Sequence, residues 1–299
     1  MQVSDEKTNR SGSGPLRAIL NGFQLRAASF IVTIYGDVVE PRGGALWIGN
    51  LIEVCGAVGI TETLVRTAVS RLVAGGRLAG ERQGRRSFYR LTDFARTEFA
   101  AAARVLFGPP EATAWHFVEL MGPSTEERMQ MLERSGHARL GARLAVGVRP
   151  FPPAIMPAVV FRAEVAKGAD RLGDFAAHCW DLAPHAEAYG GFLQRFAPLA
   201  EFVEAGGLLT PADCLTARLL LVHQFRLEAL RDPRLPQEVL PSDWPGEDAR
   251  RLFARLYCRL SPDADLHVAQ KFITAAGPLS MTSEATALRL TALGGVSTT

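Results

Sequence analysis

Lysine, cysteine and long apolar runs are all scarce in this sequence of 299 residues. Only Lys7, Lys167 and Lys271 stand beside 30 arginines, and the four cysteines form no CxxC pair. That cysteine usage favours reduced thiols in a cytoplasmic protein over a disulfide framework or a zinc site. No stretch reaches the length of a membrane span, and the first residues contain no apolar core of a secretory signal. We therefore expect a soluble, cytoplasmic protein that does not enter a membrane.

The overall composition is that of a globular protein. Hydrophobic residues make up 47% of the chain and the formal net charge is +2. This composition provides enough apolar side chains for a substantial core and excludes a disordered or fibrous chain. The length predicts two or three domains.

Acidic residues are scarce in one segment. Residues 60–90 contain seven arginines but only Glu62 and Glu81. Residues 1–108 as a whole hold 14 basic and 9 acidic residues, whereas residues 109–299 hold 19 and 22. A compact basic segment in an otherwise balanced protein indicates a site for a polyanion.

Residues 61–73 within this segment are predicted to form an amphipathic helix. At about 100° per residue, one arc is polar and carries no carboxylate, and the opposite arc is apolar. The polar arc consists of Thr63, Arg66, Thr67, Ser70 and Arg71. The apolar arc consists of Leu64, Val65, Ala68, Val69, Leu72 and Val73. We expect the apolar arc to be buried and the polar arc to face a partner.

A β-hairpin is predicted over residues 77–92, directly after this helix. Gly84 supplies the positive φ that a tight turn needs. The arginines near its tip are Arg82, Arg85, Arg86 and Arg90, opposed only by Glu81. Asp93 is placed to cap a following helix over residues 94–107.

Apolar helices over residues 27–39 and 45–58 precede these two elements, and together the four are the parts of a winged helix-turn-helix. A helix fits the major groove of B-DNA, where arginine and short polar side chains reach base edges. Guanidinium groups on the hairpin, or wing, bind phosphates. We therefore predict that the polar arc of the helix reads bases and that the four hairpin arginines hold the DNA backbone.

The rest of the chain predicts an α+β multidomain protein. Residues 1–24 are expected to be a disordered segment or arm, and 25–108 the winged-helix domain. Strands over 114–121, 144–148 and 158–165, with a helix over 124–135, predict a ferredoxin-like domain at 109–183. Helices over 187–196, 198–205, 211–231 and 246–260 predict a helical domain at 184–276, followed by a tail at 277–299 without a role in the core.

Three segments resemble a known family. They are residues 31–52 (IVTIYGDVVEPRGGALWIGNLI), 59–92 (GITETLVRTAVSRLVAGGRLAGERQGRRSFYRLT) and 231–249 (RDPRLPQEVLPSDWPGEDA). The family is that of the PaaX-type transcriptional repressors of phenylacetic acid degradation. The resemblance implies a winged-helix domain, a ferredoxin-like domain similar to Cas2 and a helical C-terminal domain. It also implies a homodimer that binds an inverted repeat in duplex DNA and is released by phenylacetyl-CoA or a related aryl-CoA thioester.

A CoA ester needs basic side chains near an aromatic-lined cleft. The residues that match this requirement are Tyr189, His223, Arg226 and Trp244. Two other interpretations stay open. Trp244 could anchor the 241–245 loop in the core, and His223 and Arg226 could pair with Asp232 or Asp243 instead of binding a ligand.

No catalytic or metal site is predicted. The candidate metal ligands lack zinc-site spacing, apart from the adjacent His178 and Cys179. These candidates are His178, Cys179, His185, Cys214, His223 and His267. Ser87 and Cys214 have no histidine placed by a recognisable motif, so we expect neither an enzyme nor a cofactor. The alternatives are an enzyme acting on a CoA thioester and a non-specific nucleic-acid-binding protein.

Overall fold

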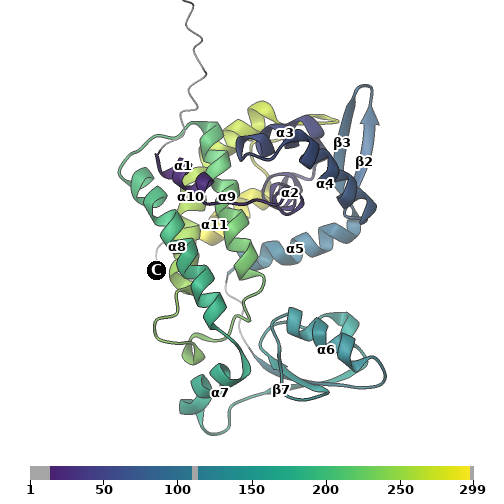
Figure 1. Ribbon diagram of the computed structural model, residues 1–299, viewed down its shortest axis with the longest axis vertical. Helices are drawn as coiled ribbons and strands as arrows, with labels where there is room; N and C mark the ends of the chain where they lie inside the picture. Colours follow the sequence, from purple (N-terminus) through teal and green to yellow (C-terminus); the bar gives the residue numbers. More distant parts are fainter. Residues whose placement is uncertain (1–13, 110–113, 297–299) are drawn as a thin grey trace, which may run out of the picture. The chain divides into compact units, whose positions relative to one another are not determined.

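A computed structural model of the chain describes residues 14–109 and 114–296 (Figure 1). The chain forms two compact units, and neither is a single continuous stretch. The first unit contains residues up to 108 together with 193–224 and 250 onward. The second contains residues 109–192 and 225–249. Helices and small antiparallel sheets occur together, which confirms the α+β class.

The first unit begins with a helix that was not predicted. Helix α1 (Gly14–Asn21) buries Leu16 and Ile19, so residues 14–21 are not an arm. Residues 1–13 lie outside the described part. Helix α2 (Ala27–Ile34) buries Phe30, Ile31 and Ile34. It continues into a π-helical turn (Tyr35–Val39) and a 3₁₀ turn (Glu40–Arg42) that contains Pro41.

Helices α3 (Ile48–Ala57) and α4 (Glu62–Ala74) follow, and both pack against α2. The predicted helix over 45–58 was too long at its start. Leu46 and Trp47 instead form strand β1 (Leu46–Trp47), which pairs with β3 through Trp47 and Phe88. Sheet pairing at these two residues prevails over the helical pattern of the sequence.

The predicted hairpin consists of β2 (Leu78–Gln83) and β3 (Arg86–Leu91), in a sheet of order β1-β3-β2. Gly84 has φ +59°, the positive value that the first residue of a two-residue type II′ loop requires. Figure 1 shows the hairpin beside α4, with its tip extending past the helix. Helix α5 (Asp93–Phe107) comes next, and its N-cap is Thr92 rather than Asp93, because the Thr92 hydroxyl accepts from the Ala95 N–H.

Three long helices contribute to both units. They are α8 (Ala183–Glu204), α9 (Pro211–Ala229) and α10 (Gly246–Lys271). The sequence predicted two helices, 187–196 and 198–205, in place of α8. It also predicted that the last helix ends at residue 260, ahead of Pro262. Both helices continue through their prolines, which remove a single N–H donor each without ending the helix.

The chain after 277 was predicted to play no part in the core, and this is wrong. Strands β8 (Ile273–Thr274) and β9 (Gly277–Pro278) form a small ladder, and helix α11 (Glu284–Val296) follows. Leu293 on α11 is fully buried. Arg289 donates from Nη1 to the Gly36 carbonyl at 3.0 Å. Helix α11 thus packs on the turn that follows α2.

A buried charge network lies in the first unit. The Arg218 guanidinium on α9 is 1% exposed and donates to Asp37 at 3.0 Å and to Asp265 at 2.7 Å. Arg42 donates to the same Asp265 oxygen at 2.7 Å. The Tyr257 hydroxyl donates to Asp37 at 2.9 Å. This network ties the π-helical turn after α2 to helices α9 and α10.

The second unit contains a four-stranded antiparallel sheet of order β5-β6-β4-β7. Its elements are β4 (Trp115–Leu120), α6 (Thr125–Arg134), β5 (Ala138–Arg139), β6 (Leu144–Gly147) and β7 (Ala158–Ala163). A 3₁₀ turn (Pro153–Ile155) joins β6 to β7, and a further one (Ala169–Arg171) precedes α7 (Leu172–Cys179). Strand β5 and helix α7 were not predicted. Strand β5, with two residues, is too short to leave a periodic pattern in the sequence.

Each side of this sheet has its own core. One consists of Val118, Leu120, Met129, Leu132, Ala145 and Ile155. The other consists of Ala138, Val146, Val148, Ala176, Trp180, Leu235 and Val239. The motif at 231–249 therefore serves partly as a cover for the sheet. The predicted segment 184–276, in contrast, is divided between the two units.

Candidate nucleic-acid interface

Helix α4 presents its polar arc to solvent, as the sequence predicts. The five residues of this arc, Thr63, Arg66, Thr67, Ser70 and Arg71, are all exposed. The buried arc is narrower than predicted, with Val65, Ala68 and Val69 inside the core. Leu64 is 55% exposed and Val73 is 38% exposed, so assigning them to the core was wrong. These two side chains lie at the edges of the apolar arc, outside the surface through which α4 packs against α2 and α3.

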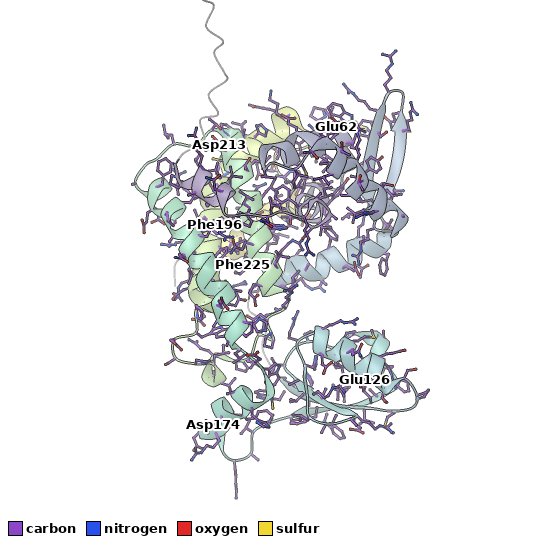
Figure 2. The ribbon with its side chains drawn as sticks, viewed as in Figure 1. Glu62, Glu126, Asp174, Phe196, Asp213 and Phe225 are labelled. Atoms are coloured by element: carbon purple, nitrogen blue, oxygen red, sulfur yellow. The ribbon has the colours of Figure 1, made fainter. Side chains whose placement is uncertain are left out.

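The predicted absence of carboxylates from this surface is also wrong. Glu62, labelled in Figure 2, begins α4 and pairs with Arg66 one turn later. The Arg66 Nη2 to Glu62 Oε1 distance is 2.6 Å, and both side chains are more than half exposed. A pair of this kind contributes little to stability because water and salt screen it. Arg66 can therefore leave Glu62 and bind a more highly charged anion with only a small loss of folding free energy.

Thr67 uses its hydroxyl within the helix. The Thr67 Oγ1 donates to the Thr63 carbonyl at 2.9 Å, the usual bond of a helical threonine to the preceding turn. Its hydroxyl proton is therefore engaged, while the oxygen can still accept a bond.

All four predicted hairpin arginines are exposed. Within the part of the chain that the structure describes, no carboxylate lies at ion-pair distance from Arg82, Arg85, Arg86 or Arg90. Arg82 donates to the Gly84 carbonyl at 3.1 Å, and Arg86 lies over the Trp47 ring at 5.2 Å. Glu81, the single acid on the hairpin, accepts instead from Gln83 at 3.0 Å. The positive charges of the four hairpin arginines are thus not neutralised by carboxylates of the described residues.

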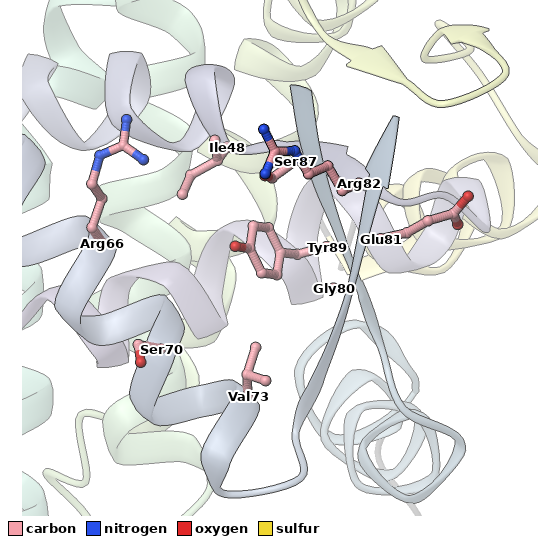
Figure 3. A pocket seen from close by; sticks show the side chains of 9 residues that line it. All are labelled: Ile48, Arg66, Ser70, Val73, Gly80, Glu81, Arg82, Ser87 and Tyr89. Atoms are coloured by element: carbon pink, nitrogen blue, oxygen red, sulfur yellow. The ribbon is translucent and has the colours of Figure 1, made fainter. Parts of the chain in front are cut away.

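A groove of about 450 Å³ lies between α4 and the hairpin (Figure 3). Its lining residues are Ile48, Arg66, Ser70, Val73, Gly80, Glu81, Arg82, Ser87 and Tyr89. Figure 3 shows the Tyr89 ring reaching from β3 towards α4, whereas the Glu81 carboxylate points away from the helix. The side chains that enter the groove are therefore neutral or cationic. Ser87 and Tyr89, which lie on β3 between Arg86 and Arg90, were not predicted to border such a groove.

The hairpin is held in place by contacts at its base. Gly80 is opposite Tyr89, and a Cβ at Gly80 would lie only 2.9 Å from the Tyr89 ring. The Tyr35 hydroxyl donates to the Tyr89 carbonyl at 2.9 Å. Glycine at position 80 therefore lets the tyrosine ring lie across β2 and border the groove.

The predicted effector residues do not all lie in the same unit. His223 belongs to the first unit, where it is 4% exposed. Its Nδ1 lies 2.8 Å from the Thr33 hydroxyl, and the ring meets the edge of Phe30 at 5.5 Å. Neither Asp232 nor Asp243 is the partner of His223 in these bonds. His223 therefore occupies a core position that packs α9 against α2, and its role as a ligand contact stays a prediction.

Tyr189, Arg226 and Trp244 belong to the second unit. The Tyr189 hydroxyl donates to Asp232 at 2.7 Å, and the Trp244 ring meets Tyr189 edge-on at 6.0 Å. Burial lowers the pKa of Arg226 to about 10, so its guanidinium is still charged at neutral pH. These three residues provide two aromatic rings and one cation.

The described residues, 14–109 and 114–296, contain neither a membrane-spanning helix nor a cluster of metal ligands. No helix there combines the length and the apolar character needed to cross a lipid bilayer. No cluster of three or more His, Cys, Asp or Glu side chains suited to a metal ion occurs in the same residues.

Known proteins resemble the chain along most of its length. A family model described as PaaX-like protein matches residues 26–95, and one described as the C-terminal domain of PaaX-like protein matches residues 180–270. The transcriptional repressor PaaX of Escherichia coli K12 is 31% identical over 285 residues, which are 87% of this chain and 88% of that protein. An uncharacterized protein of known structure from Mycobacterium tuberculosis is 21% identical, with a TM-score of 0.46, over 73% of this chain and 89% of that one.

Proposed function

The chain belongs to the PaaX-like family of transcriptional repressors, and we propose that it represses transcription by binding duplex DNA through α4 and the β2–β3 hairpin. One observation carries this proposal. The exposed polar face of α4 stands beside a hairpin whose four arginines have no carboxylate partner in the described chain. Such a surface is the electrostatic footprint of a nucleic-acid-binding protein.

The arrangement supports a winged helix-turn-helix. Helices α3 and α4 are joined by a short turn, and the hairpin follows α4 as a wing. With α4 in the major groove and the wing beside it, the DNA strand between them passes along the groove between α4 and the hairpin. Arg66 and Arg82 line that groove, and Ser87 and Tyr89 offer hydroxyl donors to phosphate oxygens.

The second unit supports the ferredoxin-like assignment. Its strand order β5-β6-β4-β7, with one helix between β4 and β5, is the order of a ferredoxin-like sheet whose second helix is reduced to a 3₁₀ turn. We further propose that the protein acts as a homodimer on an inverted repeat, because a two-fold protein matches a palindromic site.

The wing gives the first test of this proposal. Arg85→Ala with Arg86→Ala should weaken binding to every duplex sequence and lower the slope of log K against log [salt] by about 1–2 units, since two phosphate contacts are lost. Fluorescence anisotropy with a duplex selected from a random library, and with an unselected duplex, measures both quantities. Sequence-specific binding should exceed unselected binding by about 10³ or more.

The matched control is Arg96→Ala with Arg104→Ala. Both of these arginines are exposed on α5, in the same unit, and their loss removes the same net charge. The salt slope of this control should stay close to that of the wild-type protein. Equal slopes for the two double variants would refute a specific role of the wing.

We propose that an aryl-CoA thioester such as phenylacetyl-CoA releases the repressor, with Tyr189, Arg226 and Trp244 as contacts. The two rings suit the aryl group and the guanidinium suits a CoA phosphate. A coupling of about 1–3 kcal/mol between the two ligands would lower DNA affinity by roughly 5–150-fold. Aromatic catabolism of the phenylacetate type is the process that such an effector would control.

Arg226→Ala should bind DNA with the affinity of the wild-type protein but should no longer be released from it by phenylacetyl-CoA. Fluorescence anisotropy during a titration with phenylacetyl-CoA measures this release, and free CoA is the ligand control. Arg231→Ala, at an exposed position in the turn just after α9, should respond like the wild-type protein. A normal response by Arg226→Ala would remove that residue from the site. Release of free thiol from phenylacetyl-CoA by the wild-type protein would favour the enzyme alternative instead.

A further inference from the structure

Leu64 is an apolar side chain on the DNA-facing side of α4. It is 55% exposed in the first turn of the helix, where the other exposed residues are polar. At about 100° per residue, Leu64 lies roughly 20° from Arg71 and 60° from Thr67 around the helix axis. It therefore shares a stripe with two residues of the polar arc, and its side chain takes no part in the core between α4 and α2.

Thr67 adds to the apolar character of this stripe. Its hydroxyl proton is donated to the Thr63 carbonyl at 2.9 Å, so this side chain has no free donor for a base edge. What Thr67 still offers is its methyl group and an accepting oxygen. Leu64 and Thr67 are one turn apart and together make a small apolar spot.

The major groove offers one apolar group that matches this spot. The 5-methyl group of thymine is the only methyl on the base edges of unmodified DNA, and apolar side chains contact it. The N-terminal residues of a recognition helix are the ones that reach base edges. Arg66 and Arg71 on the same helix provide the cationic surface that brings this turn against the duplex.

We infer that Leu64 determines specificity by packing against the 5-methyl group of a thymine in the operator. This inference rests on the proposed DNA-binding function and adds one base-reading contact to it. The contact requires no hydrogen bond, so it selects thymine by the methyl group alone. Loss of one buried methyl group should change affinity by about fourfold.

The test uses the duplex selected from a random library. Each thymine is replaced in turn by deoxyuridine, which removes the 5-methyl group and keeps every hydrogen-bonding atom. With the wild-type protein, one position in each half-site should lose about fourfold in affinity on this change, measured by anisotropy at fixed salt. Leu64→Ala should bind the thymine and deoxyuridine duplexes equally at that position.

Arg66→Ala is the matched control, because Arg66 is exposed on the same helix and its proposed role is polar. It should bind the selected duplex more weakly, by about 10-fold or more, and still prefer thymine about fourfold. Thermal melting of Leu64→Ala should be unchanged, since the leucine lies outside the core. A melting temperature close to that of the wild-type protein shows that the variant is folded.

Each outcome decides the question. Equal affinity of the wild-type protein for thymine and deoxyuridine at every position would overturn the inference while leaving sequence-specific binding intact. A thymine preference that survives in Leu64→Ala would assign the methyl contact to another residue and also overturn it. A wild-type protein that prefers no duplex over any other would refute the proposed function itself.

Discussion

Arg218→Met is expected to lower the free energy of unfolding by about 3–5 kcal/mol, because it leaves two buried carboxylates without their shared cation. Arg218 is 1% exposed and donates to Asp37 and Asp265 at 3.0 and 2.7 Å. Methionine has a similar length and no charge, so the loss reports on the interaction and not on a cavity. Urea denaturation followed by far-ultraviolet circular dichroism measures it, since the first unit is mostly helical.

The two carboxylates should be affected unequally. Asp265 keeps Arg42, whose Nη2 lies 2.7 Å from its Oδ1. Asp37 keeps the Tyr257 hydroxyl, which donates to its Oδ1 at 2.9 Å but carries no positive charge. Asp37→Asn in the Arg218→Met background should therefore restore part of the lost stability, because it removes the charge that lost its partner. Asp265→Asn in that background should restore less.

The protonation state of Arg218 does not complicate this experiment. Burial alone would lower the pKa of Arg218, but the carboxylates of Asp37 and Asp265 raise it above its ordinary value. The guanidinium is therefore charged at every pH used for denaturation. Neutralisation of arginine at high pH cannot imitate the variant.

An exposed ion pair in the same unit provides the comparison. Arg255 lies 3.5 Å from Glu204, and both side chains are about half exposed. Arg255→Met should cost less than about 1 kcal/mol, because water screens such pairs. If Arg218→Met were no more destabilising than Arg255→Met, the buried network would not be needed to hold the π-helical turn against α9 and α10.

The features that the sequence predicted well are those that local rules determine. The polar arc of α4 follows from the helical period, and the hairpin follows from a glycine that takes φ +59° between two strand patterns. The arginines of the wing could be named because acids are scarce around them. Each of these signals lies within about 15 neighbouring residues, so no distant partner is needed to interpret it.

The features that the sequence could not predict depend on distant partners. Arg218 and Arg85 are the same residue type, yet one lies in the core between Asp37 and Asp265 and the other is exposed at a hairpin tip. Helix α11 was taken for a tail because its residues are small and polar, whereas Arg289 reaches the Gly36 carbonyl from it. Contacts across 181 or 253 residues leave no periodic pattern.

The effector residues illustrate the same limit. Tyr189 and Trp244 lie together, with 6.0 Å between their ring centroids. His223 is two residues from Phe225 in sequence but has its partners, Thr33 and Phe30, on α2. A histidine is available to a ligand only where its side of the helix does not pack against a neighbouring helix. The helical period alone does not show which side of α9 packs against α2.

Arg128→Met is expected to destabilise the second unit by about 3–5 kcal/mol, because five backbone carbonyls lose a buried cationic donor group. Arg128 on α6 is 7% exposed. Its guanidinium donates to the carbonyls of Met121, Pro123, Ser124, Ile155 and Pro157. These carbonyls belong to two segments, the loop that follows β4 and the turn that precedes β7. Tryptophan fluorescence during urea denaturation reports on this unit, which contains Trp115, Trp180 and Trp244.

Two further variants sharpen this experiment. Arg134→Met, at an exposed position on the same helix, should change the unfolding free energy by less than about 0.5 kcal/mol. Arg128→Lys should recover only a small part of the loss, because an ammonium group places its three donors at one point and cannot reach two loops as a planar fork does. Full recovery by lysine would show that charge alone matters, and equal stability of Arg128→Met and Arg134→Met would show that the loops are held by other contacts.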